Sequence, residues 1–517
     1  MSTPTHNEIG YGWLAAHYGV LATQPLAVES CIGRKRHTYE ANGVRQETYL
    51  EAMRPEDTLA AHLTFALKHE GVHLELLARL FQNIDADHLA AWVRQEPTGQ
   101  YARRAGFLFE WLTGNTLDIP ETGGNYRDAL DPHHYVTAET PRRNRRWRIN
   151  DNLPGTPDYC PLVRRTPDVE SAQAYDIARR LEDMEGEFGA DILRRSAVWL
   201  TIHESRASFA IEHESGHQDR IQRFAVAMEQ YCGRLPDPLD PHALSQLQSA
   251  ILGVSTIRPG LRESPVFVGS RSVGYGSVIH YVCPHWEWLP GMLEGLRRFL
   301  ASTDSSQSLI RAAVASFGFV FIHPLADGNG RVSRFLVNDL LRRDGLVPAP
   351  FILPVSAAIT SSAIRRVEYD RVLEQYSRPF MARYRESVEF RQERQHYADG
   401  IESDFDFSAY TLAAPSWRYP DLTDQIEYLG GVIRYTLEHE MHHQAALQRA
   451  WYGTRAAIKD WVEGPDDHID RIIRAIRQNG RVSGKLCKEF PVLEDPRLAR
   501  KLEELVAEGF EGLNEQA

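Results

Sequence analysis

Apolar residues recur at helical spacing along much of this chain, and the pattern predicts a mainly α-helical protein. The spacing is clear at residues 11–18, 58–81 and 101–112. It returns between residues 170 and 228 and ends at a group of prolines, which cannot continue a helix. An apolar run at 309–322 leads into a polar loop, and a further helical pattern follows that loop.

Other stretches interrupt this helical pattern. Residues 119–170 are rich in Pro, Gly, Asp, Asn and Arg, which is typical of an irregular connection or an extended arm. Two short β-type runs flank a glycine-rich turn between residues 264 and 282 and predict a hairpin. The 391–425 segment is polar and aromatic with few clear periods. A long helix is expected at about 423–462, and two more helical runs at 467–510.

The composition narrows the class of protein. The chain has 517 residues, 43% of them apolar, which is enough for several domains with sizeable cores. Its formal charge of −12 gives no global attraction to nucleic acid or to an anionic membrane. The five scattered cysteines suit a reducing compartment and no structural zinc. We find no signal region and no run of about 18 apolar residues, so a cytoplasmic protein without a membrane span is expected.

The chemistry concentrates in the polar loop that follows the apolar run. Gly328 and Gly330 can take positive φ and bring backbone N–H groups close to a ligand. A helix that starts near Arg331 offers N–H donors and a positive dipole end to an anion. Asp327 is a hard oxygen ligand suited to Mg²⁺ held against phosphates. His323 lies just upstream, where it could take a proton at neutral pH.

Three side chains of this segment suit phosphate. Asn329 can donate to phosphate oxygens through its amide group. Arg331 and Arg334 are spaced i and i+3, so they share a helix face and can clamp phosphate charge. A polar interhelical turn would not need this set of residues at these offsets.

The segment 323–334 resembles the signature of the Fic-domain family, His-Pro-Phe-x-Asp/Glu-Gly-Asn-Gly-Arg-x-x-Arg. It differs only at Leu325, where the family has a packing Phe. The resemblance implies transfer of AMP from ATP to a Ser, Thr or Tyr hydroxyl of a protein. It also implies His323 as general base, Asp327 as Mg²⁺ ligand, and Asn329 and Arg331 on the phosphates.

The predicted hairpin resembles the target-docking flap of the same family. Such a flap pairs with the backbone of the target as an added strand. The matching residues are Val266, Phe267, Val268 and Gly269. Taken alone, these runs favour a purely structural hairpin.

A third element precedes the loop. Ser205, Ser208, Phe209 and Glu212 fall on one helix stripe. They resemble the inhibitory motif Ser/Thr-x-x-x-Glu-Gly/Asn of some Fic proteins, although His213 stands where Gly or Asn is usual. The resemblance implies that Glu212 pairs with Arg334 and keeps the γ-phosphate from its productive position. In some relatives the same Glu supports removal of AMP, and that reverse activity stays open here.

Tyr369 matches a tyrosine of the family that contacts the nucleotide base.

The resemblance also suggests a domain plan. The tail resembles winged-helix segments, and a protein-contact or homodimer module fits it as well as a DNA reader does. A nucleic-acid-binding regulator that uses the Fic fold as a scaffold is therefore the alternative function. The expected segments are a helical N-terminal domain (1–190), an inhibitory helix region (191–235), a Fic core (236–390), a linker and long helix (391–465) and a winged-helix-like module (466–517).

Two segments match the zinc-protease pattern H-E-x-x-H. They begin at His69 and at His439, and Glu463 stands at the spacing of a third ligand for the second segment. The chain has 21 histidines, so the pattern arises easily by chance. We interpret these histidines as packed or solvated helix residues.

Overall fold

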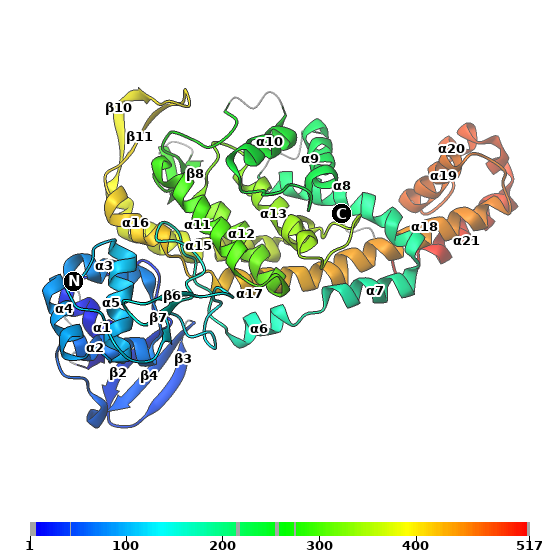
Figure 1. Ribbon diagram of the computed structural model, residues 1–517. Helices are drawn as coiled ribbons and strands as arrows, with labels where there is room; N and C mark the ends of the chain where they lie inside the picture. Colours follow the sequence, from blue (N-terminus) through cyan, green and yellow to red (C-terminus); the bar gives the residue numbers. More distant parts are fainter. Residues whose placement is uncertain (1–6, 42, 213–217, 254–257, 273–275, 514–517) are drawn as a thin grey trace. The chain divides into compact units, whose positions relative to one another are not determined.

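The computed structural model describes residues 7–41, 43–212, 218–253, 258–272 and 276–513, and it confirms a mainly α-helical fold (Figure 1). The chain divides into two compact units. The first comprises Met1–Ala174, Tyr231–Asp344 and Arg366–Gly430, and the second Tyr175–Gln230, Gly345–Arg365 and Gly431–Ala517. Each unit is therefore built from segments far apart in the sequence.

The N-terminal part of the first unit combines helices with a sheet that the sequence analysis missed. Four strands take the order β1-β2-β4-β3, and β2 runs parallel to β4. Their polar and apolar residues are mixed, so no clean alternation identified them. The strands are β1 (Glu8–Ile9), β2 (Val28–Gly33), β3 (His37–Ala41) and β4 (Val44–Leu50).

The helices of this part largely match the prediction. The expected helix at 58–81 is two helices, because the chain breaks at Gly71, which has φ +91°. Their apolar faces share one core with the rest of the N-terminal part. The helices are α1 (Tyr11–Tyr18), α2 (Leu59–His69), α3 (Leu74–Asn83), α4 (Ala86–Gln95) and α5 (Gln100–Thr113).

The predicted irregular arm is mostly irregular and contains one small sheet. Three short strands take the order β5-β7-β6: β5 (Arg127–Asp128), β6 (Arg142–Asn144) and β7 (Ile149–Asp151). Trp147, in the turn between β6 and β7, is fully buried against Gly106 of α5. The arm ends at α6 (Pro167–Gln173). Burial of this one large side chain anchors the arm on the N-terminal helices.

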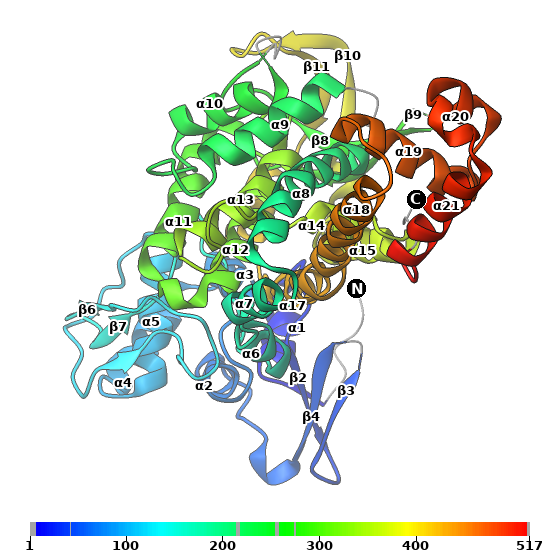
Figure 2. The ribbon, with the colours of Figure 1, turned by 90° about the vertical axis from the view of Figure 1, so that its right-hand side faces the viewer.

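Helices α12 (Ser308–Ile322) and α13 (Asn329–Arg343) form the centre of the first unit and lie side by side (Figures 1 and 2). The same part of the unit contains α10 (Pro241–Leu252), α11 (Leu289–Ser302) and the hairpin β8 (Phe267–Ser272) and β9 (Gly276–Val282). Ser305–Ile322 is the one helical stretch in the described residues that is long and apolar enough to cross a membrane, and 78% of it is buried inside the protein. This stretch corrects the expectation that no such run exists, and its burial is that of a core helix.

The polar segment after the core also holds a second hairpin. Its strands are β10 (Val388–His396) and β11 (Glu402–Phe407), which pair antiparallel. It follows α15 (Ala363–Tyr384) and precedes α16 (Tyr410–Arg418) and α17 (Thr423–Tyr435). The sequence shows few clear periods over 391–425, and this hairpin occupies the start of that segment.

The described residues of the second unit form helices joined by loops and contain no strand. Helix α8 (Ala190–Ile211) lies beside α18 (His442–Lys459), and it also contacts α14 (Val355–Thr360) (Figure 2). The expected long helix passes from α17 through a π-helical turn, Thr436–Met441, into α18. The remaining helices are α7 (Ile177–Phe188), α9 (Gln218–Tyr231), α19 (Asp466–Asn479), α20 (Gly484–Glu489) and α21 (Pro496–Gly509).

The tail shares a small apolar core with α18, around Ile472, Ile473 and Leu502 of the tail and Ile458 of α18. It is helical as predicted, but its described residues, 466–513, contain no strand that could form a wing. Short 3₁₀ turns complete the chain at Glu51–Met53, Trp286–Trp288, Ser305–Gln307, Arg385–Ser387 and Pro491–Glu494.

Candidate functional site

His323 ends α12 in an unusual backbone conformation. Its φ is +51°, in the left-handed region, and its N–H donates to the Phe319 carbonyl at 2.9 Å. Nδ1 lies 3.2 Å from the Val320 carbonyl oxygen. A carbonyl can only accept, so Nδ1 carries the proton in this arrangement and Nε2 is the basic nitrogen. The helix end thus fixes both the position and the tautomer that a general base needs.

Asn329 closes the loop between the two central helices. Its Oδ1 accepts the N–H of Leu325 at 2.9 Å, and its Nδ2 donates to the carbonyl of Leu325 at 2.7 Å. We expected this amide to donate to phosphate; its oxygen and one N–H instead hold the loop, which leaves the second N–H for a ligand. The packing residue Leu325 is fully buried.

The glycines of the loop differ from one another. Gly328 has φ +89° and caps α13, and an added Cβ would come within 3.1 Å of Leu252. Gly330 lies in the first turn of α13. The expectation of positive φ therefore holds for Gly328 and fails for Gly330, whose lack of a side chain still leaves the helix N-terminus open to an anion.

Asp327 and Arg331 pair across the start of α13. Asp327 Oδ1 lies 3.0 Å from Arg331 Nη2, and the Asp327 side chain is 61% exposed while that of Arg331 is 3% exposed. The exposed carboxylate can therefore serve a metal ion, and the buried guanidinium has donors beyond the one that Asp327 uses. Arg334 is also buried, one turn along the same helix.

Two side chains that the sequence analysis missed hold this loop from outside. Arg262 donates from Nε to the His323 carbonyl at 2.8 Å, from Nη1 to Ser264 at 2.9 Å and from Nη2 to Pro284 at 2.6 Å. Gln248 donates to the Asp327 carbonyl and accepts from Gly260, both at 2.8 Å. Burial lowers the pKa of Arg262. Neither residue belongs to a sequence motif, so only their contacts identify them.

The predicted flap is a two-stranded hairpin. Phe267 pairs with Val282, and the register shifts by a bulge between Val268 and Gly269. Because the sheet has two strands, each keeps an outer edge without a strand partner in the described part. Val268 is exposed on this hairpin. An exposed edge of this kind can accept an extended peptide as a further strand.

The unexpected hairpin of β10 and β11 braces the base of the flap. Phe267 packs on Phe405 with ring centroids 4.8 Å apart, and on Phe390 at 6.0 Å. Asp399, in the turn of this hairpin, accepts from the Ser264 hydroxyl at 2.7 Å and from the Glu263 N–H at 3.0 Å. The alternation of Phe and polar residues in these strands was the available sequence signal.

The predicted inhibitory residues lie in the second unit. Ser205, Ser208 and Phe209 are fully buried on α8, which confirms the predicted helix stripe, and Glu212 is the C-cap residue of that helix. His213 lies outside the described residues. Arg334 belongs to the first unit, so the pairing of Glu212 with Arg334 stays a prediction.

Tyr369 is a buried residue of α15. Its ring packs on that of Tyr428 with centroids 6.2 Å apart, and the Arg366 guanidinium lies 5.7 Å from its centroid. Its contact with a nucleotide base stays a prediction.

The donors of the loop fit a magnesium ion that is bound through one carboxylate and substrate phosphates. Among the described residues, no group of three or more His, Cys, Asp or Glu side chains could hold a metal. Mg²⁺ is commonly bound by one or two carboxylates plus phosphate oxygens, so the exposed Asp327 is sufficient.

The two histidines of the zinc-protease pattern that begins at His69 do not lie on one helix. His69 is the last residue of α2 and His73 is the N-cap of α3. The two side chains are therefore not one turn apart on a single helix. In the second segment, a π-helical turn contains His439 and ends before His443.

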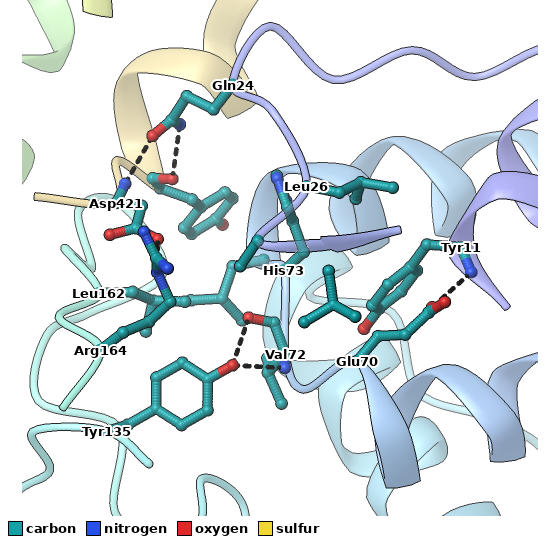
Figure 3. A pocket seen from close by; sticks show the side chains of 14 residues that line it. Tyr11, Gln24, Leu26, Glu70, Val72, His73, Tyr135, Leu162, Arg164 and Asp421 are labelled. Carbon is teal, nitrogen blue, oxygen red and sulfur yellow. Dashed lines mark hydrogen bonds and ion pairs between the residues drawn. The ribbon is translucent and has the colours of Figure 1, made fainter. Parts of the chain in front are cut away.

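A separate small pocket lies in the N-terminal part of the first unit (Figure 3). The hydroxyl of Tyr135 bonds the backbone of Val72, and Arg164 pairs with Asp421 at 2.7 Å. Glu70 accepts the Tyr11 N–H at 2.7 Å, and burial raises its pKa to about 7. No residue of the catalytic loop lines this pocket.

Comparison with known proteins identifies the helical core. Residues 238–341 match the Fic/DOC family. The chain is 44% identical over 97 residues to "Protein adenylyltransferase fic-1" of Caenorhabditis briggsae, which covers 18% of this chain and 17% of that protein. It is 36% identical over 107 residues to "Protein adenylyltransferase Fic" of Drosophila sechellia, 20% of each chain. The chain thus spans about a fifth of the length of the curated relatives it matches.

Solved structures show weaker similarity. A Fic family protein from Desulfovibrio desulfuricans is 20% identical with a TM-score of 0.36, over 66% of this chain and 92% of that one. A Fic-domain signalling protein from Bacteroides thetaiotaomicron is 16% identical with a TM-score of 0.28, over 54% of this chain and 94% of that one.

Proposed function

We propose that this chain, whose residues 238–341 match the Fic/DOC family, transfers AMP from ATP to a hydroxyl group of a target protein. The observation that carries this proposal is the His323 loop, in which the basic nitrogen, an exposed carboxylate and a buried arginine converge between α12 and the start of α13. These are the parts that an in-line displacement at phosphorus requires.

In the proposed reaction the acceptor oxygen attacks the α-phosphorus of ATP. The new O–P bond forms while the bond to the β-phosphate oxygen breaks, so pyrophosphate leaves and AMP stays on the target. The hydroxyl proton passes to Nε2 of His323, whose Nδ1 is held by the Val320 carbonyl. Base catalysis of this type contributes about 10²- to 10⁴-fold in rate.

The start of α13 binds the phosphates in this proposal. Its first-turn N–H groups and dipole favour an anion, and Gly330 leaves them uncovered. Arg331 donates to phosphate oxygens, and Asp327 would hold a magnesium ion. Such an ion, when bound, neutralises phosphate charge and orients the leaving group. Tyr369 is the proposed contact of the adenine base.

The flap presents the acceptor hydroxyl. A backbone segment of the target adds to β8 along Val266–Gly269, and its side chain then reaches the His323 loop. The bracing of Phe267 by Phe405 and Phe390 supports this role, because a rigid edge loses less conformational entropy when it binds a peptide.

The resting activity is proposed to be set by Glu212. A carboxylate that forks onto Arg334 competes with the γ-phosphate for the same donors. The buried stripe of Ser205, Ser208 and Phe209 supports this proposal, because it fixes the helix that ends at Glu212.

The experiment follows transfer from ATP labelled at the α-phosphate. Glu212→Gly is expected to raise labelling of the protein itself and of a lysate, and His323→Ala in that background to lower it by about 10²-fold or more. ATP labelled at the γ-phosphate is the control, since it should label nothing. Undiminished α-label with His323→Ala would refute the proposal, and γ-label would show phosphoryl transfer instead.

The remaining expectations are separate proposals. We place the protein in the cytoplasm, which fractionation tests. The tail is proposed as a contact module for a second copy of the chain or for nucleic acid. Light scattering of the full-length protein tests the first role. Oligonucleotide binding by the tail variant, Arg474→Glu with Arg500→Glu, tests the second.

A further inference from the structure

The arm carries a dense group of arginines. Residues 141–150 include five arginines and no acidic residue, in a chain whose formal charge is −12. The fold brings two more arginines, Arg103 of α5 and Arg127 of β5, to the same place. We call Arg103, Arg127, Arg143 and Arg148 the arginine patch; Arg142 and Arg145 lie on the same β6–β7 hairpin.

The four arginines of the patch are neighbours. Arg103 donates to the carbonyls of Trp147 at 3.3 Å and Arg148 at 3.0 Å, so its guanidinium lies under the hairpin turn. The Arg127 N–H also donates to the Arg148 carbonyl, at 3.1 Å. The Tyr126 ring lies 5.4 Å from the Arg143 guanidinium and 5.6 Å from that of Arg148.

The patch lacks a countercharge. Among the described residues, no carboxylate forms an ion pair with any of its four arginines, whereas the adjacent Arg146 pairs with Glu110 at 3.2 Å. Arg103 is 2% exposed, and burial, Arg127 and Arg148 all lower its pKa. The buried Nε–H groups of Arg103 and Arg148 find no acceptor among the described residues.

Buried cations are normally paired, because an uncompensated buried charge is costly. Among the other buried arginines of the first unit, Arg79 pairs with Glu75 and Arg311 with Asp344, whereas Arg262 donates to three backbone carbonyls. Arg103 also donates to backbone carbonyls, but it lies within a group of like charges that lower its pKa. An anion bound at the patch would relieve this repulsion.

A basic hollow continues from the patch. Arg127 lines both, and Lys68, Tyr101 and Arg104 line the hollow with it. Arg104 donates only to the backbone carbonyls of Asp128 and Leu67 in the described part of the chain. Four acids also line the hollow: Asp128 accepts from Asn150, Asp131 caps the turn at His133, Glu70 accepts the Tyr11 N–H, and Glu40 is exposed. Positive charge thus extends over several elements of the first unit.

We infer that the arginine patch and the adjoining hollow bind a single strand of nucleic acid. One phosphate would satisfy Arg103 and its neighbours, but charges spread over α2, α5 and the β6–β7 hairpin match a chain of phosphates. Tyr101 and Tyr126 interleave with these cations, and aromatic rings among arginines are typical of single-strand binding. The strands of the arm have two or three residues each, too short to enter the major groove of a duplex.

The test measures anisotropy of a labelled deoxythymidine oligonucleotide of about 20 nucleotides with the full-length protein. Arg127→Glu with Arg143→Glu reverses two exposed charges that make no ion pair, so folding should be retained. We expect affinity to fall at least about 10-fold and the salt dependence, the slope of log K against log salt, to weaken by about 1.4, or about 0.7 per lost phosphate contact. The matched control, Arg179→Glu with Arg194→Glu, reverses two exposed charges outside both proposed contact surfaces and should bind as the unaltered protein does. A tail control, Arg474→Glu with Arg500→Glu, reverses two exposed charges in the other proposed contact surface and shows whether the tail binds the strand.

Three outcomes would overturn the inference. The first is equal loss of binding in the tail control, which would assign the binding to the tail. The second is tighter binding of a glutamate oligomer of equal charge than of the oligonucleotide, which would make the surface a dock for acidic protein segments. The third is absence of salt-dependent binding. None of these readouts depends on AMP transfer, so the inference stands or falls apart from the proposed function.

Discussion

Replacement of Arg262 tests how the His323 loop is held. Arg262→Met keeps most of the buried volume and removes three donors, whose acceptors are the carbonyls of His323, Ser264 and Pro284. Hydrogen bonds from a charged donor contribute about 1.5–3 kcal/mol each. Desolvation of the guanidinium, which shows as its lowered pKa, offsets part of that sum. We expect a net loss of about 3–5 kcal/mol, because the carbonyls are left buried without donors.

The loss of stability in Arg262→Met should appear first as local opening of the His323 loop. Without Arg262 Nε, the His323 carbonyl loses the bond that helps to hold its φ of +51°. Amide hydrogen exchange in a peptide covering residues 319–331 should then accelerate by about 10²-fold, if about 3 kcal/mol of local protection is lost. AMP transfer in the Glu212→Gly background should fall as well, because a general base must stay within hydrogen-bond reach of its proton.

Arg311→Met is the matched control. Arg311 is also buried and also binds several acceptors, the Asp344 carboxylate and the Thr303 carbonyl among them, but it does not touch the loop. Its replacement should lower the urea midpoint without a selective change in exchange at 319–331. If Arg262→Met leaves loop exchange unchanged, or if Arg311→Met accelerates it equally, the loop is not held by Arg262 and the reasoning fails.

Two further predictions concern single buried positions. Glu70 has its pKa raised from 4.5 to about 7, so the folded chain holds more protons than the unfolded chain between these values and stability falls as pH rises through them. Glu70→Gln keeps an oxygen for the Tyr11 N–H and should gain up to about 3 kcal/mol at pH 8 and almost nothing near pH 4.5, measured as urea midpoints; an equal gain at both pH values would contradict this origin. Gly328→Ala forces φ +89° on an L residue and a Cβ within 3.1 Å of Leu252, so it should cost about 1–2 kcal/mol and weaken ATP binding in calorimetry, and unchanged ATP affinity would show that the loop tolerates the methyl group.

The sequence by itself identified the candidate catalytic residues and most of the helices. The residues of 323–334 stand at fixed offsets along the chain. The helix that follows them is local structure, so these offsets do not depend on tertiary packing. Helical periods at 11–18, 101–112 and 309–322 appear in the structure with at most small changes of boundary, as α1, α5 and α12. Their apolar stripes are set by local geometry, which the sequence displays directly.

Only the tertiary structure decided how these parts are held together. Arg262 bonds His323, which is 61 positions away along the chain, and Gln248 bonds Asp327, which is 79 positions away. No sequence periodicity marks either residue. Asn329 also closes its own loop, because the Leu325 backbone lies within reach of its amide, and its contact with phosphate stays a prediction. The β2–β4 and β10–β11 pairings were missed because their strands mix exposed polar and apolar residues. Strand pairing and buried polar contacts depend on which distant groups come together, so the sequence shows the participants but not their partners.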